Sequence, residues 1–450
     1  MDYRGNSGPF DFSDFETALI IMDLRGKRVT VVGLGRSGLA ASNLLIEKGA
    51  RVSITECLDN QKIKENIRKL KGTVPNIEIG RHTEDLIKGR DLVVISPGVS
   101  GHSLPVLWAK KKGIHVVGEI ELAFASCCAP IIAISGTNGK TTVSTLVGRI
   151  FRKARRRCVV CGNIGNPFAA EVLGISNEDV VILEVSSFQL ETIDKFKPKV
   201  AVILNLSADH LDRYADFNEY FRVKCRIFSN QTEADWAILN KEDACGLTMA
   251  KRTKARVLFF SKNKAAAPPG FDDNQIAALT ISSLFAVPKD VAIDTCRHFK
   301  GIEHRMEQVA EFKGVEFIND SKATNVDSTL WALSSIKKPI ILIAGGKDKG
   351  SDFTALRERI NDSVRAMILL GEAKEKIEEA FRDVVKTLTV TSLSEALRCA
   401  LRLARPGDCV LLSPMCASFD MFSDYTERGR VFKQAVYDLV HSAQQSTVDS

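Results

Sequence analysis

The chain has 450 residues, more than one hydrophobic core usually serves, so we expect three domains. Its composition is 45% hydrophobic and 26% charged, and no continuous apolar run approaches the roughly 18 residues that span a bilayer. This predicts a soluble protein without membrane insertion. The net charge of +7 arises from 62 basic and 55 acidic residues, which suits a polyanionic ligand such as a nucleotide and requires no nucleic acid.

The eleven cysteines follow no disulfide framework, which favours a reducing cytoplasm. Cys158 and Cys161 form a CxxC in an apolar segment without a second pair, so buried strand thiols are favoured over a zinc site. Residues 1–21 have no basic region leading into a long apolar core, unlike a secretory signal. The segment from Met22 resembles a natural start, so residues 1–21 are expected to be a flexible extension or a start-site error.

In chain order, the pattern predicts three α/β domains. A strand at 28–34, a glycine turn, a helix at 39–48 and a strand at 51–55 form a βαβ unit. Together with strands at 91–95 and 114–117, it predicts a Rossmann-like domain over 1–118. Strands at 131–135, 180–184 and 200–205 predict a P-loop-type mononucleotide-binding domain over 119–301.

The third domain is expected to be an open α/β domain over 302–450. Its expected strands are 315–319, 340–344, 366–370 and 409–413. Its expected helices are 325–334, 353–361, 373–381 and 393–404.

The segment 131–142, IIAISGTNGKTT, is a buried strand that runs into a glycine loop and a helix. Glycines let backbone N–H groups approach a phosphate chain, the helix N-terminus faces the anion, and Lys140 neutralises its charge. Thr141 can reach Mg²⁺. The spacing is GxxGKT, and the first glycine of the Walker pattern would fall on Ile134, so this is a variant phosphate-binding loop.

The segment 33–38, GLGRSG, satisfies GxGxxG after a strand, and Glu56 follows at about the distance of a ribose-binding acid. The motif alone is weak evidence. It indicates a backbone that can hold a diphosphate at a helix start, and NAD and a UDP-sugar both offer that group. Both readings stay open on these residues alone.

Two further segments place polar groups at strand ends. Glu184 ends an apolar strand, and His210 lies just past the next one. Adjacent parallel strands end on the same side of a sheet, so Glu184, His210 and Thr141 are expected to converge on a metal ion beside the triphosphate. His210 by itself would more often be an ordinary polar residue.

Together these segments resemble the Mur ligase family from about residue 22 to 440. The resemblance is carried by GTNGKTT (136–142), GNIG (162–165), EVSSFQLE (184–191), ILNLSADHLDRY (203–214), HRME (304–307), NDSKATN (319–325), GGKDKGSDF (345–353) and LLSPMCASFDMF (411–422). Within the family, NDSKATN and SPMCASFD are similar to the D-glutamate-adding member. The resemblance implies an ATP-dependent amide ligase that works through an acyl phosphate in cell-wall precursor synthesis.

The resemblance also implies ligands and site residues. The partners would be UDP-N-acetylmuramoyl-L-alanine and D-glutamate, with ATP and two Mg²⁺ ions, and Lys224 would be carbamylated. The catalytic residues would be Lys140, Glu184, His210 and Lys224, and the metal ligands Thr141, Glu184, His210 and Lys224. ATP would contact Gly136, Thr137, Asn138, Gly139, Lys140, Thr141, Thr142, Arg305 and Asp320. The UDP-substrate would contact Gly35, Arg36, Ser37, Glu56, Asn163 and Ser186. D-glutamate would contact Thr324, Lys349, Ser418, Phe419 and Tyr425.

The chain departs from the family pattern in two places. Between Phe259 and Asn274 it is shorter than expected, so a small antiparallel sheet is predicted to be missing and the adenine contact is in doubt. Tyr425 stands where phenylalanine is expected. The rival hypotheses are a folylpolyglutamate synthetase-like ligase, an NAD(P)-binding protein and a non-catalytic regulator. A monomer is expected.

Overall fold

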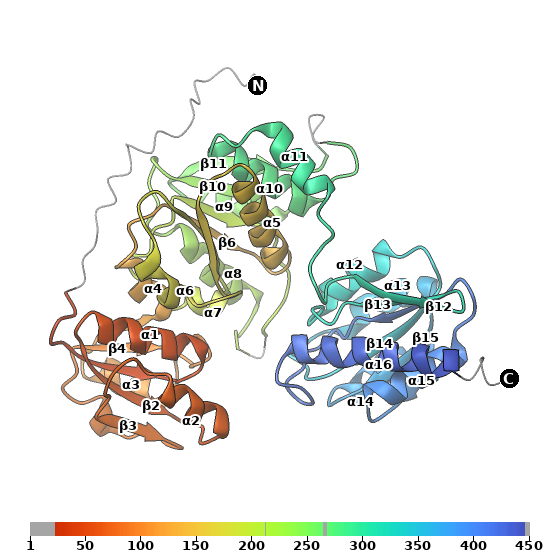
Figure 1. Cartoon of the computed structure of the whole chain (residues 1–450), viewed down its shortest axis with the longest axis horizontal. Helices are drawn as coiled ribbons and strands as arrows, with labels where there is room; N and C mark the ends of the chain where they lie inside the picture. The colour runs from red at the N-terminus through yellow and green to blue at the C-terminus, as the bar shows by residue number, and fades with distance from the viewer. Residues whose placement is uncertain (1–22, 212, 264–267, 446–450) are drawn as a thin grey trace. The chain divides into compact units, whose positions relative to one another are not determined.

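The computed structural model describes residues 23–211, 213–263 and 268–445, with side chains up to 441 (Figure 1). The predictions about residues 1–21 lie outside this part of the chain. Contacts divide the chain into two compact units, Met1–Leu206 with Asn218–Phe299 and Ser207–Phe217 with Lys300–Ser450. The domain boundaries expected at 118/119 and 301/302 stay predictions.

The first sheet of the first unit has five parallel strands in the order β3-β2-β1-β4-β5. The strands are β1 (Arg28–Val32), β2 (Arg51–Glu56), β3 (Asn76–Ile79), β4 (Leu92–Ile95) and β5 (Val116–Gly118). Four of the five residues of β1 are buried, as expected for a central parallel strand covered on both faces. The helices are α1 (Arg36–Glu47), α2 (Gln61–Arg68), α3 (Leu104–Lys111) and α4 (Glu119–Phe124).

The second sheet of this unit has six parallel strands in the order β11-β10-β9-β6-β8-β7. The strands are β6 (Ile131–Ser135), β7 (Cys158–Gly162), β8 (Val180–Glu184), β9 (Val200–Ile203), β10 (Trp236–Asn240) and β11 (Arg256–Phe260). One face packs on α5 (Lys140–Lys153), α10 (Asp273–Leu284) and α11 (Lys289–Arg297). The other helices are α6 (Phe168–Glu171), α7 (Ser187–Leu190), α8 (Phe217–Cys225) and α9 (Ala244–Ala250). Because all six strands are parallel, the ends of β6, β8 and β9 lie at one edge.

The sheet of the second unit is mixed, in the order β12-β13-β17-β14-β15-β16, and only the edge pair β12–β13 is antiparallel. The strands are β12 (Glu307–Phe312), β13 (Val315–Asn319), β14 (Ile340–Gly345), β15 (Val364–Leu370), β16 (Lys386–Thr389) and β17 (Cys409–Leu412). Two core clusters cover its two faces. The helices are α12 (Val326–Ser335), α13 (Arg357–Ser363), α14 (Lys374–Phe381), α15 (Leu393–Leu403) and α16 (Tyr425–Gln445).

The predicted α/β class with three sheets is confirmed, and one expected helix differs in type over its first turn. The helix expected at 353–361 is a 3₁₀ turn at Phe353–Leu356 followed by α13. The side chain of Asp352 accepts a hydrogen bond from Thr354 N and begins that tight turn. The CxxC lies on β7, where Cys161 is buried and Cys158 partly buried.

Candidate active site

The predicted phosphate loop joins β6 to α5. Gly136 and Gly139 have φ values of 140° and 86°, which only glycine adopts without strain. A Cβ on Gly139 would lie 2.3 Å from Asn274 Oδ1, so that asparagine lies against the loop. Helix α5 begins without a side-chain cap. Its first-turn N–H groups therefore suit an anionic ligand.

Asn205, which follows β9, holds the loop in place. Its side-chain oxygen accepts from Asn138 N at 2.9 Å, and its amide donates to Asn138 O at 3.2 Å. Its carbonyl accepts from Thr137 N at 2.9 Å. Lys140 Nζ donates to Gly136 O at 2.9 Å and to Thr137 O at 2.7 Å. The lysine thus folds back over loop carbonyls, within reach of the region that a phosphate would occupy.

Lys224 reaches the same loop from α8. Its side chain is buried, and Nζ donates to Ser135 Oγ at 3.0 Å and to Gly136 O at 3.1 Å. The ammonium also lies 5.4 Å from the Tyr220 ring centroid, and the Tyr220 hydroxyl is 3.1 Å from Thr137 Oγ1. Two residues four apart on α8 therefore face the phosphate loop. A lysine on a helix is more often solvated, so the burial of Lys224 against the loop distinguishes it from an ordinary helix lysine.

Glu184 offers an unused oxygen at the end of β8. It is 1% exposed, and Oε1 accepts from Asn163 Nδ2 at 2.8 Å. Its buried Oε2 has no hydrogen-bond partner among the described residues. Such a carboxylate oxygen is costly unless it binds a proton or a cation, so it fits a metal ligand. Thr141 is also buried, in the first turn of α5.

His210 belongs to the second unit, whereas Thr141 and Glu184 belong to the first. The expected convergence of the three therefore stays a prediction. In the second unit, Asp209 Oδ1 lies 3.2 Å from Lys349 Nζ, and Asp209 Oδ2 accepts from Asn325 Nδ2 at 3.1 Å. The acid beside His210 thus pairs with a lysine expected to bind D-glutamate.

The N-terminal glycine turn is held by Glu56. This buried carboxylate accepts from Leu34 N at 2.6 Å and from Leu58 N at 2.9 Å. Gly35 caps α1 with no heavy atom near its would-be Cβ, and the Arg36 guanidinium donates to Gly165 O. Ser37, in the first turn of α1, is partly exposed.

Ser186, also expected at the UDP-substrate, caps α7. Its hydroxyl accepts from Gln189 N at 3.3 Å, and the Gln189 side chain accepts in return from Ser186 N at 2.9 Å. This reciprocal capping box gives Ser186 a structural role at the start of α7. Asn163, expected at the same ligand, already orients Glu184. For both residues, ligand binding stays a prediction.

The nucleotide residues expected in the second unit, Arg305 and Asp320, lie just before β12 and just after β13, the antiparallel edge pair. Asp320 is buried, and burial raises the pKa of its carboxyl to about 7, while nearby Arg305 acts in the opposite direction. The carboxylate accepts from Met306 N at 3.2 Å and from Ser413 Oγ at 2.9 Å. Asp320 therefore has the environment of a functional acid.

The residues expected at D-glutamate differ in exposure. Ser418 is 2% exposed and Phe419 is 69% exposed, whereas Thr324 is intermediate. The Tyr425 hydroxyl lies 3.2 Å from Lys322 Nζ. Tyr425 thus has a polar partner that phenylalanine could not use.

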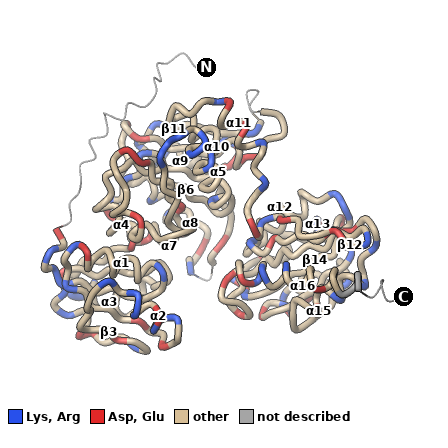
Figure 2. The backbone as a smooth tube through the Cα atoms, in the orientation of Figure 1, with Lys and Arg blue, Asp and Glu red and all other residues tan. Residues whose placement is uncertain are grey.

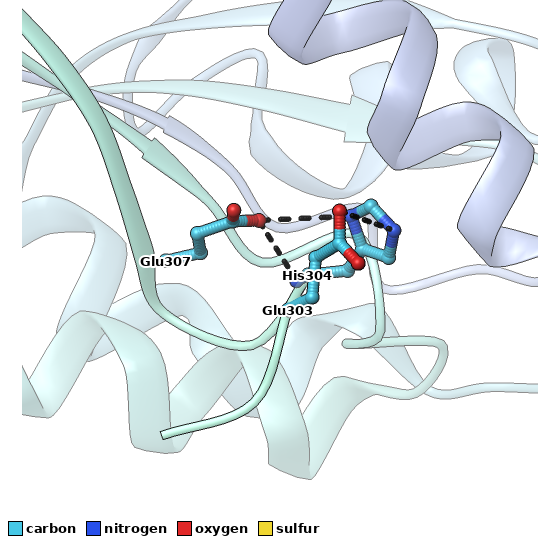
Figure 3. A group of neighbouring side chains, drawn as sticks. All are labelled: Glu303, His304 and Glu307. Carbon is cyan, nitrogen blue, oxygen red and sulfur yellow. Dashed lines mark hydrogen bonds and ion pairs between the residues drawn. The ribbon is translucent and has the colours of Figure 1, made fainter. Parts of the chain in front are cut away.

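One cluster of possible metal ligands, Glu303, His304 and Glu307, is shown in Figure 3. Lys433 Nζ lies 3.0 Å from a Glu303 oxygen and 2.5 Å from a Glu307 oxygen. Burial lowers the pKa of His304, and Asn319 Nδ2 donates to its Nδ1 at 2.8 Å. With the carboxylates paired to a lysine, we interpret this cluster as a structural ion-pair network.

A phosphate loop at the edge of a parallel sheet, flanked by one buried lysine, one partly buried lysine and a buried carboxylate, defines a nucleotide-binding α/β enzyme. The chain belongs to the Mur ligase family. Three family models match it: the Mur ligase MurD-like N-terminal domain at 27–118, the Mur ligase middle domain at 134–307 and the Mur ligase glutamate ligase domain at 304–416.

A relative from Caldanaerobacter subterraneus subsp. tengcongensis, named UDP-N-acetylmuramoylalanine–D-glutamate ligase, is 41% identical over 93% of this chain and 100% of its own. The alignment spans 451 positions although it uses 93% of 450 residues, so it leaves gaps in this chain. This agrees with a shortened segment and does not locate it.

Two solved structures share the fold. UDP-N-acetylmuramate-alanine ligase from Thermotoga maritima has a TM-score of 0.58 at 15% identity, covering 92% of this chain and 99% of its own. A bifunctional folylpolyglutamate synthase/dihydrofolate synthase from Yersinia pestis has a TM-score of 0.52 at 18% identity, covering 67% and 90%.

Sequence reasoning missed Asn205, Asn274 and Tyr220 as site residues. Asn205 lies within a quoted family segment and directly after a buried strand, so its position at the sheet edge was an available signal. The contacts of Asn274 and Tyr220 with the loop depend on how α10 and α8 pack.

Proposed function

We propose that this chain joins D-glutamate to the L-alanyl carboxylate of UDP-N-acetylmuramoyl-L-alanine, at the expense of ATP. The observation that carries the proposal is the 41% identity to a relative named for this activity, over 93% of this chain and the whole of the relative. The N-terminal match to the MurD-like model supports the same choice, and so does the phosphate loop. The folylpolyglutamate synthetase-like rival has a fold relative that covers only 67% of the chain.

The reaction divides into two transfers. A carboxylate oxygen of the substrate attacks the γ-phosphorus of ATP, ADP leaves, and an acyl phosphate forms. The D-glutamate nitrogen then attacks the acyl carbon, phosphate leaves, and the nitrogen loses a proton. Phosphoryl transfer depends mainly on positioning and on charge stabilisation. The N–H groups at the start of α5 and the Lys140 ammonium supply both at the phosphate chain.

We further propose that Thr141, Glu184, His210 and carbamylated Lys224 hold two Mg²⁺ ions. The orphaned Oε2 of Glu184 supports a cation in the first unit. A neutral or cationic lysine is a poor Mg²⁺ ligand, whereas carbamylation gives Lys224 anionic oxygens. When bound, Mg²⁺ neutralises phosphate charge. Asn163 orients Glu184, and Tyr220 packs beside Lys224.

For the remaining ligands, the proposal keeps the assignments made by resemblance. Glu56 suits an N–H or O–H donor of the UDP group, because its Oε2 accepts only from Leu34 N within the described part of the chain and retains a lone pair, whereas Oε1 accepts from both Leu58 N and Cys57 Sγ. Gly35 leaves open space at the start of α1. Lys349 would exchange Asp209 for a substrate carboxylate.

The decisive measurement is phosphate release with UDP-N-acetylmuramoyl-L-alanine, ATP and single amino acids. We expect release with D-glutamate and little with L-glutamate, together with the amide product by mass spectrometry. Release with a dihydropteroate or folate acceptor instead would support the folylpolyglutamate synthetase-like rival. Tight NAD(P) binding without ligation would favour the NAD(P)-binding protein, and no turnover with any acceptor would favour the regulator.

We also propose a cytoplasmic location. None of the eleven cysteines, all of which lie in the described ranges, forms a disulfide, as in a reducing compartment. None of the helices in the described ranges is both long enough and apolar enough to cross a membrane.

A further inference from the structure

Helix α8 has a second polar face. Tyr220 and Lys224 point to the phosphate loop, whereas Arg222 precedes Lys224 by two positions and so lies about 200° around the helix. Arg222, Cys225, Arg226 and Ser229 follow helical spacing and line a cavity of about 230 Å³. Arg252 and Lys254, which follow α9, complete its basic lining. Four cations thus surround one cavity outside the proposed active site.

These cations lack acidic partners. None of Arg222, Arg226, Arg252 and Lys254 forms an ion pair with a carboxylate within the described part of the chain. Nearby Lys197 and Lys199 show the ordinary arrangement, because both pair with Asp235 at 3.2 and 3.8 Å. The repulsion among the four charges is therefore not relieved by a side-chain anion.

Helix dipoles provide an ordinary explanation for part of this charge, because the cavity lies where α8 and α9 end. A helix C-terminus carries about half a negative charge, so the two ends together offset about one of the four positive charges. A substantial positive charge remains. The two helix ends are therefore not enough to compensate the four cations, and a bound anion would compensate the remaining charge.

Two of the guanidinium groups are already fixed. Arg226 donates to Glu191 O at 3.0 Å and to Ile193 O at 2.5 Å, and Arg252 stacks 5.2 Å from the Phe221 ring centroid. Ordering them on binding would cost little entropy. Burial raises the pKa of the Cys225 thiol to about 11 and Arg252 opposes the rise, with no carboxylate among the causes.

We propose that this cavity binds a small phosphate-bearing anion such as phosphate or pyrophosphate. Guanidinium groups form paired, charge-assisted hydrogen bonds with phosphate oxygens, and Ser229 adds a hydroxyl at the rim. Its volume of about 230 Å³ lies below the roughly 300–1,000 Å³ typical of drug-sized ligands, so a compact anion fits best. The site is separate from the phosphate loop and does not depend on the proposed ligase activity.

The test titrates the full chain with phosphate and with pyrophosphate by calorimetry at constant ionic strength, in a Lys140→Ala background that weakens the phosphate loop. We expect Arg222→Ala/Arg252→Ala to weaken binding at least tenfold. The matched control is Arg398→Ala/Arg402→Ala, which removes the same charge from exposed positions on α15 and should leave binding unchanged. Tighter binding of pyrophosphate than of phosphate would identify the preferred anion.

A local readout distinguishes this cavity from residual binding at the loop. Cys225 lines the cavity, whereas Cys57 is exposed and directly follows β2 in the other sheet of the unit. The anion should slow iodoacetamide labelling of Cys225 severalfold, as resolved by peptide mass spectrometry, and leave Cys57 unaffected. Equal binding by both double variants, or unprotected Cys225 at saturation, overturns the proposal. If the Arg222/Arg252 variant misfolds, Lys254→Gln in the same labelling assay replaces it.

Discussion

The first unit contains two strand–glycine–helix turns of similar design, one after β1 and one after β6, and they are held by opposite charges. A carboxylate, Glu56, binds backbone N–H groups at the first turn. At the second, the amide of Asn205 holds the loop, and Lys140 and Lys224 donate to its carbonyls. Figure 2 shows that acidic and basic residues are otherwise intermixed along the chain.

This difference teaches that a glycine turn does not by itself specify a phosphate site. An ionised carboxylate at the turn repels a phosphate at close range, whereas two ammonium groups attract it. We therefore expect the ATP phosphates at the second turn and a ligand group that donates hydrogen bonds at the first. The following predictions test this division, from the largest expected effect to the smallest.

Lys224→Ala should lower ligation by about a thousandfold, because it removes the group that would become an anionic metal ligand beside the second turn. A short carboxylic acid should restore part of the rate by supplying that oxygen. Phosphate release measures both effects, and circular dichroism checks the fold. Lys241→Ala, an exposed lysine of the same domain, is the control. Near-normal turnover of untreated Lys224→Ala would remove the residue from the site.

At the first turn, two glycines are expected to have different roles: Gly38 allows close packing, and Gly35 leaves room for a ligand. A Cβ on Gly38 would lie 1.8 Å from Gly33 O, whereas one on Gly35 meets nothing within 4 Å. Gly38→Ala should therefore lower the free energy of unfolding by about 1–3 kcal/mol, measured by denaturant titration. Gly35→Ala should preserve stability and raise the KM for the UDP-substrate. Equal stability of the two variants would contradict this packing.

The sequence predicted the central strands better than the edges. Val180–Glu184 and Ile340–Gly345 are fully buried, and apart from the terminal Glu184 they consist of apolar residues and glycine. At the edge, Lys386–Thr389 has exposed ends and partly buried middle residues, and this strand was missed. Edge strands such as β3 and β16 have short, mixed patterns that resemble loops.

The site was predictable where its residues are adjacent in sequence. GTNGKTT contains the glycines, lysine and hydroxyls of the loop, so its conformation followed from local rules. Asn274 reaches Gly139 only because α10 packs on α5, and Asp209 reaches Lys349 across 140 positions. Such contacts between residues far apart in the chain cannot be predicted from the spacing of residues within a local motif. The resemblance supplied Lys224, whose spacing alone indicated an ordinary helix lysine.

We predict that the second turn binds the phosphate groups of ATP tightly but that the chain binds the adenine base weakly. Its phosphate-facing groups are present, while the segment from Phe259 to Asn274 is short. Loss of one or two hydrogen bonds to the base costs about 1–3 kcal/mol, or roughly a 5- to 150-fold rise in the KM for ATP with little change in kcat. The measurement compares ATP with GTP at saturating cosubstrates, and Asn274→Ala tests the remaining asparagine. Strict adenine preference with an ATP KM like that of longer relatives would show that another segment contacts the base.

Neither turn should depend on residues 1–21, so a chain that starts at Met22 is expected to behave like the full chain. The first sheet is anchored after that point, because Leu24 is buried and Gly26 N donates to Gly49 O at 2.8 Å. Changes away from packed contacts usually alter stability by less than about 0.5 kcal/mol. We therefore expect the same denaturation midpoint and the same KM for the UDP-substrate and for ATP. A raised KM for the UDP-substrate alone would place the extension at the first turn. A raised KM for ATP alone would place it at the second, and a lower midpoint with both constants unchanged would show that it packs on the body of the unit.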